Sequence, residues 1–173
     1  MLPSLTLVLG GAASGKSAYA ERLVMAHGGP RVYLATAEAH DAEMRAKLDR
    51  HRARRGPDWR TIEAPRDLGP ALGQVGPDDV VLLDCATMWL SNHLLDEGDL
   101  TQAEVSLFHA LDTCAAPVVV VSNEIGLSVV PDNALARRFQ NAQGALNQHL
   151  AARAGLVVNV IAGLPQVLKG ALP

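Results

Sequence analysis

The segment Gly10–Ser17, which reads GGAASGKS, has the residue types and the spacing that bind the phosphates of a nucleotide. It fits the pattern G-x-x-x-x-G-K-[ST], whose glycines let the backbone turn so that successive N–H groups point at phosphate oxygens. We expect Lys16 to reach the outer phosphates and act in catalysis, and the Ser17 hydroxyl to ligate Mg²⁺. The predicted nucleotide contacts come from all eight residues: Gly10, Gly11, Ala12, Ala13, Ser14, Gly15, Lys16 and Ser17.

Such a loop works together with a carboxylate that holds the metal ion. The segment Val80–Asp84 reads VVLLD, so an acid follows four apolar residues of a predicted strand. In open α/β sheets, ligands bind at the carboxyl ends of the strands, where this acid would lie. We therefore predict that Asp84 contacts the nucleotide and binds Mg²⁺. The alternative is that Asp84 is the N-cap of a helix that begins near Thr87.

A second group of candidate residues surrounds His51. The segment Asp41–Arg55 reads DAEMRAKLDRHRARR, and helical spacing places Met44, Leu48 and His51 on one face. Four arginines lie beside the histidine: Arg50, Arg52, Arg54 and Arg55. Their positive charges disfavour protonation of the imidazole, which leaves it nucleophilic, and they attract polyphosphate. The same pattern also fits an ordinary solvated basic helix, and the residues alone leave both interpretations open.

The elements that position these residues form an alternating pattern. Short apolar runs predict buried strands at Leu5–Leu9, Arg31–Ala35, Val80–Asp84, Val118–Ser122 and Leu156–Ile161. Helical periodicity predicts helices at Lys16–His27, Asp41–Arg55, Thr87–Leu95, Glu104–Thr113 and Ala134–Arg153. Trp59–Glu63 suits either a strand or an extended link. The alternation predicts an α/β fold, a mostly parallel sheet with helices on both faces, in one P-loop NTPase-type domain over residues 1–173.

Composition excludes several classes of function. The chain has 173 residues and a formal charge of −3, which argues against a nucleic-acid partner. Its two cysteines, Cys85 and Cys114, are too few for a disulfide scaffold and are expected to be small buried side chains. No apolar run reaches the roughly 18 residues of a membrane span, and the N-terminus lacks the basic region of a signal peptide. We expect a cytoplasmic protein.

Four segments, in order along the chain, carry a family resemblance. They read GGAASGKS, VYLATAEAHDAEMRAKLDRHRARRGPDWRTIEAP, VVLLDCATMWLSNHL and VSNEIGLSVVPDNALARRFQNAQGALNQHLA. Together they resemble the bifunctional adenosylcobinamide kinase and adenosylcobinamide-phosphate guanylyltransferase of cobalamin synthesis. The resemblance implies that the chain phosphorylates the corrinoid adenosylcobinamide with GTP or ATP. It implies next a transfer of GMP from GTP, through a GMP–histidine intermediate, to give adenosylcobinamide-GDP.

The resemblance also implies roles for particular residues. The nucleophilic histidine of the family falls on His51. Further nucleotide contacts fall on Ala35, Thr36, Ala37, Arg52, Ala53, Arg54, Arg55, Glu63 and Asp84. Members assemble as homotrimers, and the segment Thr87–Leu95, which contains Trp89 and Leu90, is a candidate for a subunit contact. Ala13 stands where many relatives carry arginine, which leaves the preferred phosphate donor open.

Three matters stay undecided at this point. Glu124 follows a predicted strand and suits either a contact to metal or substrate or a polar turn before Gly126. A P-loop kinase of small molecules without guanylyl transfer would also explain the phosphate loop and Asp84. A nucleotide switch that regulates a partner is a further alternative, although the sequence has no distinct pair of switch motifs.

Overall fold

The computed structural model describes residues 1–38, 56–96 and 98–173. Within these ranges seven strands form one sheet in the order β3-β2-β4-β5-β1-β6-β7. The strands are β1 Leu5–Gly10, β2 Arg31–Ala35, β3 Trp59–Glu63, β4 Val80–Asp84, β5 Val118–Asn123, β6 Leu156–Ile161 and β7 Leu164–Lys169. All neighbours pair in parallel except β6 and β7, which form an antiparallel hairpin. The mostly parallel α/β sheet predicted from the sequence is confirmed.

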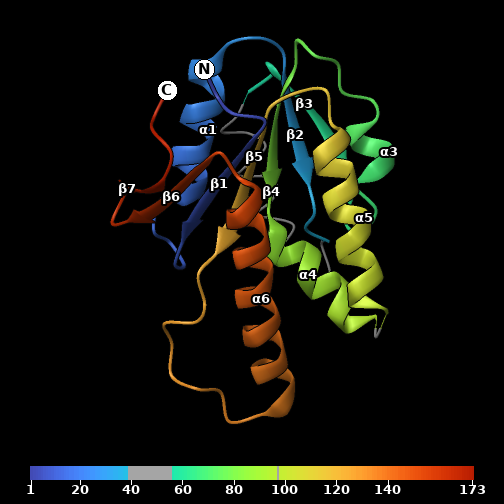
Figure 1. The fold of residues 1–173 in the computed structure, drawn as a ribbon, viewed down its shortest axis with the longest axis vertical. Helices are drawn as coiled ribbons and strands as arrows, with labels where there is room; N and C mark the ends of the chain where they lie inside the picture. The colour runs from blue at the N-terminus through green and yellow to red at the C-terminus, as the bar shows by residue number, and fades with distance from the viewer. Residues whose placement is uncertain (39–55, 97) are drawn as a thin grey trace.

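Helices of the described residues cover both faces of this sheet (Figure 1). They are α1 Lys16–His27, α3 Gly69–Leu72, α4 Ala86–Leu95, α5 Leu100–Thr113 and α6 Ala134–Arg153. The Asp99 side chain caps α5 by accepting from the Gln102 N–H, and Asn133 caps α6 by accepting from the Ala136 N–H. Such caps satisfy backbone donors that have no partner in the first turn of a helix.

Two hydrophobic clusters lie on the two faces of the sheet. On one face, Tyr19, Leu23 and other residues of α1 pack against side chains that include Tyr33 and Leu82. On the other face, residues of α3, α4, α5 and α6 pack against the alternate strand positions. This division follows from the strand period of two, which sends successive side chains to opposite faces.

The segment Trp59–Glu63, for which the sequence left two interpretations, is the edge strand β3 and pairs in parallel with β2. The short helix α3 and the strand β7 were not predicted. Pro165 lies in β7 at the other edge of the sheet, where a residue without an N–H donor is tolerated. The predicted helix Asp41–Arg55 lies outside the described residues.

Apolar side chains of α4 and α6 differ in exposure along each helix. Trp89 and Leu90 are 1% and 0% exposed within the core of this chain, whereas Leu95 at the end of α4 is 64% exposed. Leu135 shares a helical face with the buried Leu146 and Leu150 but is itself 55% exposed. The reason is that the first turns of α6 extend beyond the end of the sheet, as Figure 1 shows, so this part of the helix has no sheet to cover.

The carboxyl ends of the parallel strands β1 to β6 lie at one edge of the sheet, and the loops that follow them carry most of the predicted site residues. In the part of the chain that the structure describes, no helix is long and apolar enough to cross a membrane.

Candidate active site at the carboxyl edge of the sheet

The phosphate loop joins the end of β1 to the start of α1, the context that the motif requires. Gly15 has a φ of 92°, a left-handed conformation that suits glycine. A Cβ atom on Gly10 would lie 2.4 Å from Ser14 Oγ and 2.7 Å from the Val160 carbonyl oxygen. Glycine is therefore needed at both positions, at Gly15 for its backbone angle and at Gly10 for space.

The turn between β6 and β7 contacts the phosphate loop. The Gly163 N–H donates to the Ser14 carbonyl oxygen at 2.8 Å, and a Cβ on Gly15 would lie 3.1 Å from Gly163 Cα. Ala13 has a φ of 55°, which is unusual for a residue with a Cβ atom and costs about 1–2 kcal/mol. The contact from the hairpin helps to hold the loop in this costly conformation.

Lys16 is the first residue of α1, and its Nζ donates to the Gly11 carbonyl oxygen at 3.0 Å. The ammonium group therefore lies over the loop whose N–H groups are predicted to hold phosphate. The positive end of the α1 dipole and its first N–H groups add to the attraction for an anion here.

Asp84 ends β4, two strands away from β1 across β5. Two inter-strand spacings of about 4.8 Å separate these strands by roughly 10 Å, a gap that side chains and a bound ion can bridge. The N-cap of α4 is Cys85, which makes no side-chain cap hydrogen bond. The interpretation of Asp84 as a helix cap is therefore wrong.

The charges of Asp84 and Lys16 both affect the pKa of Cys85. Burial raises the pKa of the Cys85 thiol to about 11, the Asp84 carboxylate adds to this rise, and the Lys16 ammonium opposes it. Both charges thus act on one buried side chain. The Ser17 hydroxyl and the Asp84 carboxylate are hard oxygen donors, the type that Mg²⁺ prefers, so the residues present fit this ion.

The side chain of Asp84 is itself held by β2. The Tyr33 hydroxyl donates to Asp84 Oδ2 at 3.0 Å. The Thr36 hydroxyl donates to the Cys85 carbonyl oxygen at 2.7 Å and is within 2.8 Å of the Cys85 N–H, which donates to it. Thr36 was predicted to contact the nucleotide, whereas Tyr33 was not among the predicted site residues, because in the sequence it looks like one more apolar residue of a buried strand.

The remaining predicted residues of β2 and β3 lie farther along the same edge. Ala35 pairs with Asp84 on one side and with Glu63 on the other. Glu63 ends β3, four strands from β1, and is therefore about 19 Å from the phosphate loop by strand spacing. Thr36 is fully buried, and Ala37 is partly exposed. The structure brings Asp84 close to the phosphate loop but keeps Glu63 apart from it.

Five predicted site residues lie outside the described residues: His51, Arg52, Ala53, Arg54 and Arg55. For Glu124, Oε1 accepts from the Gly126 N–H at 2.6 Å, as the interpretation of a polar turn requires. The Glu124 N–H donates to the Gly10 carbonyl oxygen at 3.0 Å, so this turn begins beside the phosphate loop.

Two side chains that the sequence did not single out fix the end of β5. The Asn123 N–H donates to the Thr87 hydroxyl, and the Asn123 carbonyl oxygen accepts from Asn147 Nδ2. The residues Asn123 and Gly10 are register partners. The strand next to the phosphate loop is thus anchored from α4 and from α6.

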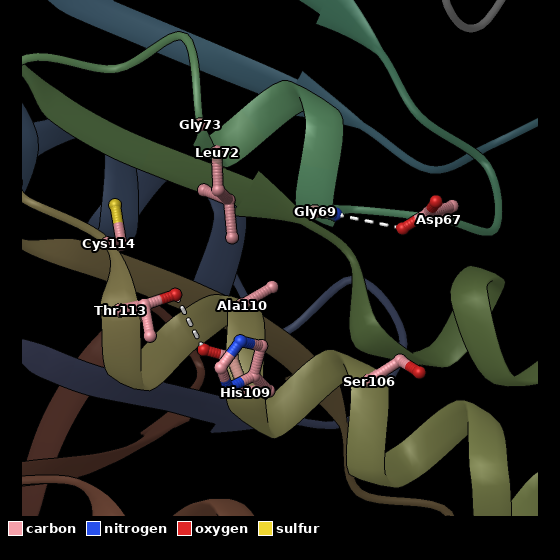
Figure 2. A pocket seen from close by; sticks show the side chains of 9 residues that line it. All are labelled: Asp67, Gly69, Leu72, Gly73, Ser106, His109, Ala110, Thr113 and Cys114. Carbon is pink, nitrogen blue, oxygen red and sulfur yellow. Dashed lines mark hydrogen bonds between the residues drawn. The ribbon is translucent and has the colours of Figure 1, made fainter.

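A cavity of about 310 Å³ lies away from this edge, between α3 and α5 (Figure 2). Its polar groups serve local structure, because the Thr113 hydroxyl donates to the His109 carbonyl oxygen and Asp67 accepts from the Gly69 N–H. Figure 2 shows both contacts within the wall of the cavity. None of the predicted site residues lines it, and we do not assign it to catalysis.

Comparison with known proteins gives a family match over most of the chain. Residues 6–168 match the model of the family described as cobinamide kinase / cobinamide phosphate guanyltransferase. The bifunctional adenosylcobalamin biosynthesis protein CobP of Pseudomonas aeruginosa is 43% identical over 167 residues, which cover 95% of this chain and 96% of the relative. The protein CobU of Escherichia coli, with the same description, is 38% identical and is covered to 99%.

Solved structures agree with the fold alone. An ATPase from the type III secretion system of pathogenic bacteria matches with a TM-score of 0.53 and 10% identity. The match covers 94% of this chain and 56% of the ATPase chain. This likeness concerns the arrangement of the sheet and its helices alone.

Proposed function

This chain belongs to the cobinamide kinase / cobinamide phosphate guanyltransferase family, and from that premise we propose that the carboxyl edge of the sheet serves both reactions of the family. The first is phosphorylation of the adenosylcobinamide hydroxyl by GTP or ATP. The second is transfer of GMP from GTP to the resulting phosphate, which gives adenosylcobinamide-GDP. The observation that carries the proposal is the strand–loop–helix setting of GGAASGKS beside a carboxylate at the end of β4.

For phosphoryl transfer we assign binding and charge neutralisation to the phosphate loop. Its backbone N–H groups hold the donor phosphates, and Lys16 neutralises charge that develops on the transferred group. Ser17 and Asp84 would hold a Mg²⁺ ion, which supplies further positive charge to the phosphates. The corrinoid hydroxyl attacks the γ-phosphorus in line with the departing β-phosphate oxygen.

For guanylyl transfer we propose His51 as the nucleophile. An imidazole nitrogen attacks the α-phosphorus of GTP, a P–N bond forms, and the bond to pyrophosphate breaks. A phosphate oxygen of adenosylcobinamide phosphate then attacks the same phosphorus, and the P–N bond breaks to release the imidazole. The support is the arginine-rich surrounding of His51 in the sequence together with its position in the family motif.

The first prediction tests this step directly. Brief exposure to GTP should add one GMP to a peptide that contains His51, as an acid-labile and alkali-stable phosphoramidate. His51→Ala should abolish both the adduct and guanylyl transfer, because no other residue is proposed to attack the α-phosphorus. Phosphorylation of the corrinoid should largely persist, because it depends on Lys16. Peptide mass spectrometry and separate assays of the two reactions measure these outcomes.

His109→Ala, on the helix α5, is the matched control and should retain the adduct. A GMP adduct on His40 would move the assignment to that residue. Guanylyl transfer that survives in His51→Ala without any adduct would exclude the covalent route. Phosphorylation with no guanylyl transfer in the unaltered protein would favour the simpler kinase that the sequence left as an alternative.

We also propose that the chain is one domain, because its described strands belong to a single sheet. We propose a cytoplasmic location, which suits a biosynthetic enzyme family, and no nucleic-acid partner, because the formal charge is −3. These proposals are separate from the catalytic assignment.

For assembly we propose a homotrimer, as the family resemblance implies. Apolar side chains in and after the loop that precedes α6 support self-association. Leu127 and Val129 are each 91% exposed, Val130 is 72% exposed and Leu135 is 55% exposed. Exposed apolar groups gathered in this way are typical of a protein contact. A hollow of about 350 Å³ between α4 and α6, lined by Leu94, Leu95, Leu135 and Phe139 among others, adjoins the start of α6.

A further inference from the structure

The strand β2 carries a tyrosine whose position is set by strand register. Tyr33 pairs with Leu82 of β4, and Ala35 pairs with Asp84. Residues two apart on a strand share a face, so Tyr33 and Asp84 lie on the same face of the sheet, two register positions apart along the strands. The phenol of Tyr33 spans this offset, and its O–H donates to Asp84 Oδ2 at 3.0 Å.

The ring of Tyr33 is held in place by its surroundings. The residue is 4% exposed and belongs to the hydrophobic cluster beneath α1. Its ring meets the Trp59 ring edge to face, with 6.4 Å between the centroids. A hydroxyl on a packed ring has little rotational freedom, so the hydrogen bond fixes one direction of the carboxylate.

The backbone that carries Asp84 is also fixed. The fully buried Thr36 hydroxyl bonds to both the N–H and the C=O of Cys85, the next residue. Neither contact is required by the fold of a generic parallel sheet, whose backbone groups pair with each other. Tyr33 of β2 therefore holds the Asp84 carboxylate, and Thr36, which follows β2, holds the backbone of Cys85.

We infer that Tyr33 is a positioning residue that holds Asp84 in the orientation needed for cation-dependent nucleotide binding. This inference rests on the proposed role of Asp84 as a ligand of Mg²⁺. An ionised carboxylate can accept about four hydrogen bonds or ligand contacts, so one bond to Tyr33 leaves capacity for a cation. Removal of a group that hydrogen-bonds to a metal ligand typically changes the metal affinity 10- to 100-fold.

The test is a Mg²⁺ titration of nucleotide binding, without catalysis. The probe is a fluorescent α,β-methylene analogue of GTP, which cannot lose pyrophosphate, in the absence of any corrinoid. In Tyr33→Phe the Mg²⁺ concentration for half-maximal binding should rise about tenfold. Binding of the same analogue in EDTA should stay unchanged, because binding in EDTA does not involve the cation that Asp84 would hold. A general loss of structure would instead weaken binding in both conditions.

Two further variants separate the outcomes. Tyr19→Phe removes the only other tyrosine hydroxyl, from the same hydrophobic cluster, and should leave the Mg²⁺ titration unchanged. In an Asp84→Asn background, Tyr33→Phe should cause no further shift, because the group that it orients has lost its charge. A thermal unfolding midpoint for each variant confirms that the proteins are folded.

The results distinguish the inference from the proposed function. If Asp84→Asn shifts the titration and Tyr33→Phe does not, the positioning role is wrong while the role of Asp84 stands. If Tyr33→Phe gives the same shift in both backgrounds, Tyr33 acts through another group and the inference fails. If Asp84→Asn has no effect, both the metal role of Asp84 and the inference are wrong.

Discussion

Two adjacent glycines at the start of the phosphate loop have different surroundings. A Cβ on Gly10 would overlap the Ser14 side chain and the Val160 carbonyl oxygen, whereas a Cβ on Gly11 would have no atom within 4 Å. The motif G-x-x-x-x-G-K-[ST] requires glycine at the first of these positions and leaves the second open, and the structure gives the physical reason. The difference comes from Ser14 within the loop and from β6, which is distant in the chain but adjacent to β1 in the sheet.

This contrast gives a prediction about stability. Gly10→Ala should lower the free energy of unfolding by about 1–3 kcal/mol, because the added methyl group has no space beside the backbone of β6. Gly11→Ala is the matched control and should change it by less than about 0.5 kcal/mol. Denaturant unfolding of both variants, without nucleotide, measures the difference. Equal losses in the two variants would show that the close contact at Gly10 is absent in solution.

At the scale of elements, α4 holds together the loops that follow β2 and β3. Asn92 is 2% exposed, and its Nδ2 donates to the carbonyl oxygens of Thr36 and Pro65. Trp89 Nε1 donates to the Arg66 carbonyl oxygen at 2.7 Å. Buried amide and indole donors need hydrogen-bond acceptors, and here the acceptors are carbonyl oxygens of the loops that follow β2 and β3. The helix thereby determines how these two loops are spaced.

A network of charged side chains continues this connection at the surface. The Arg66 guanidinium pairs with Glu38, which follows β2, and with Asp96, which follows α4. The hydrogen bond from Arg66 lowers the pKa of Asp96 below its ordinary value of 3.8. A carboxyl whose pKa is lowered by folding stabilises the folded state while it is ionised, and this contribution is lost on acidification.

The corresponding prediction concerns pH. At pH 7, Asp96→Asn should have a slightly lower thermal unfolding midpoint than the unaltered protein, and the difference should be small because the pair is exposed. The difference should shrink as the pH falls through and below 3.8, where the unaltered Asp96 becomes protonated as well. Asp112→Asn, an exposed carboxyl of α5, serves as the control. A difference that stays constant down to about pH 2 would contradict the assignment.

At the scale of the whole molecule, the loop before α6 and the first turns of this helix extend past the sheet (Figure 1). Among the described residues this extension leaves apolar side chains exposed, as the 91% exposure of Leu127 and Val129 shows. An interface between subunits would remove such groups from water, at about 25 cal/mol for each Å² buried. The proposed homotrimer thus has a physical reason at this surface.

The assembly prediction follows from that surface. Val129→Asp should shift the protein from trimer to monomer in sedimentation equilibrium at micromolar concentration, because a charge would be buried in an apolar contact. Val105→Asp is the matched control, since Val105 is 58% exposed on α5, and it should remain trimeric. Trimers that persist in Val129→Asp would place the contact elsewhere on the molecule. A monomeric unaltered protein would exclude the trimer itself.

What the sequence determined by itself is local. The motif GGAASGKS, the run VVLLD and five of the seven strands depend on neighbouring residues, so pattern and composition were sufficient to predict them. The family followed from four ordered segments, and the comparisons confirm it. The strand β7 was missed because an exposed edge strand that contains proline has neither a buried apolar run nor clear alternation.

The tertiary structure decided which distant residues meet. Tyr33 contacts Asp84 only because β2 and β4 pair in one register, although 51 positions separate the two residues in the chain. Gly10 lacks space in part because β6 lies beside β1, and Leu135 is exposed because the first turns of α6 extend past the sheet. Such contacts depend on strand order and register, which arise from the packing of the whole chain. Local periodicity carries no information about them, because it describes the face that a residue occupies and not the strand beside it.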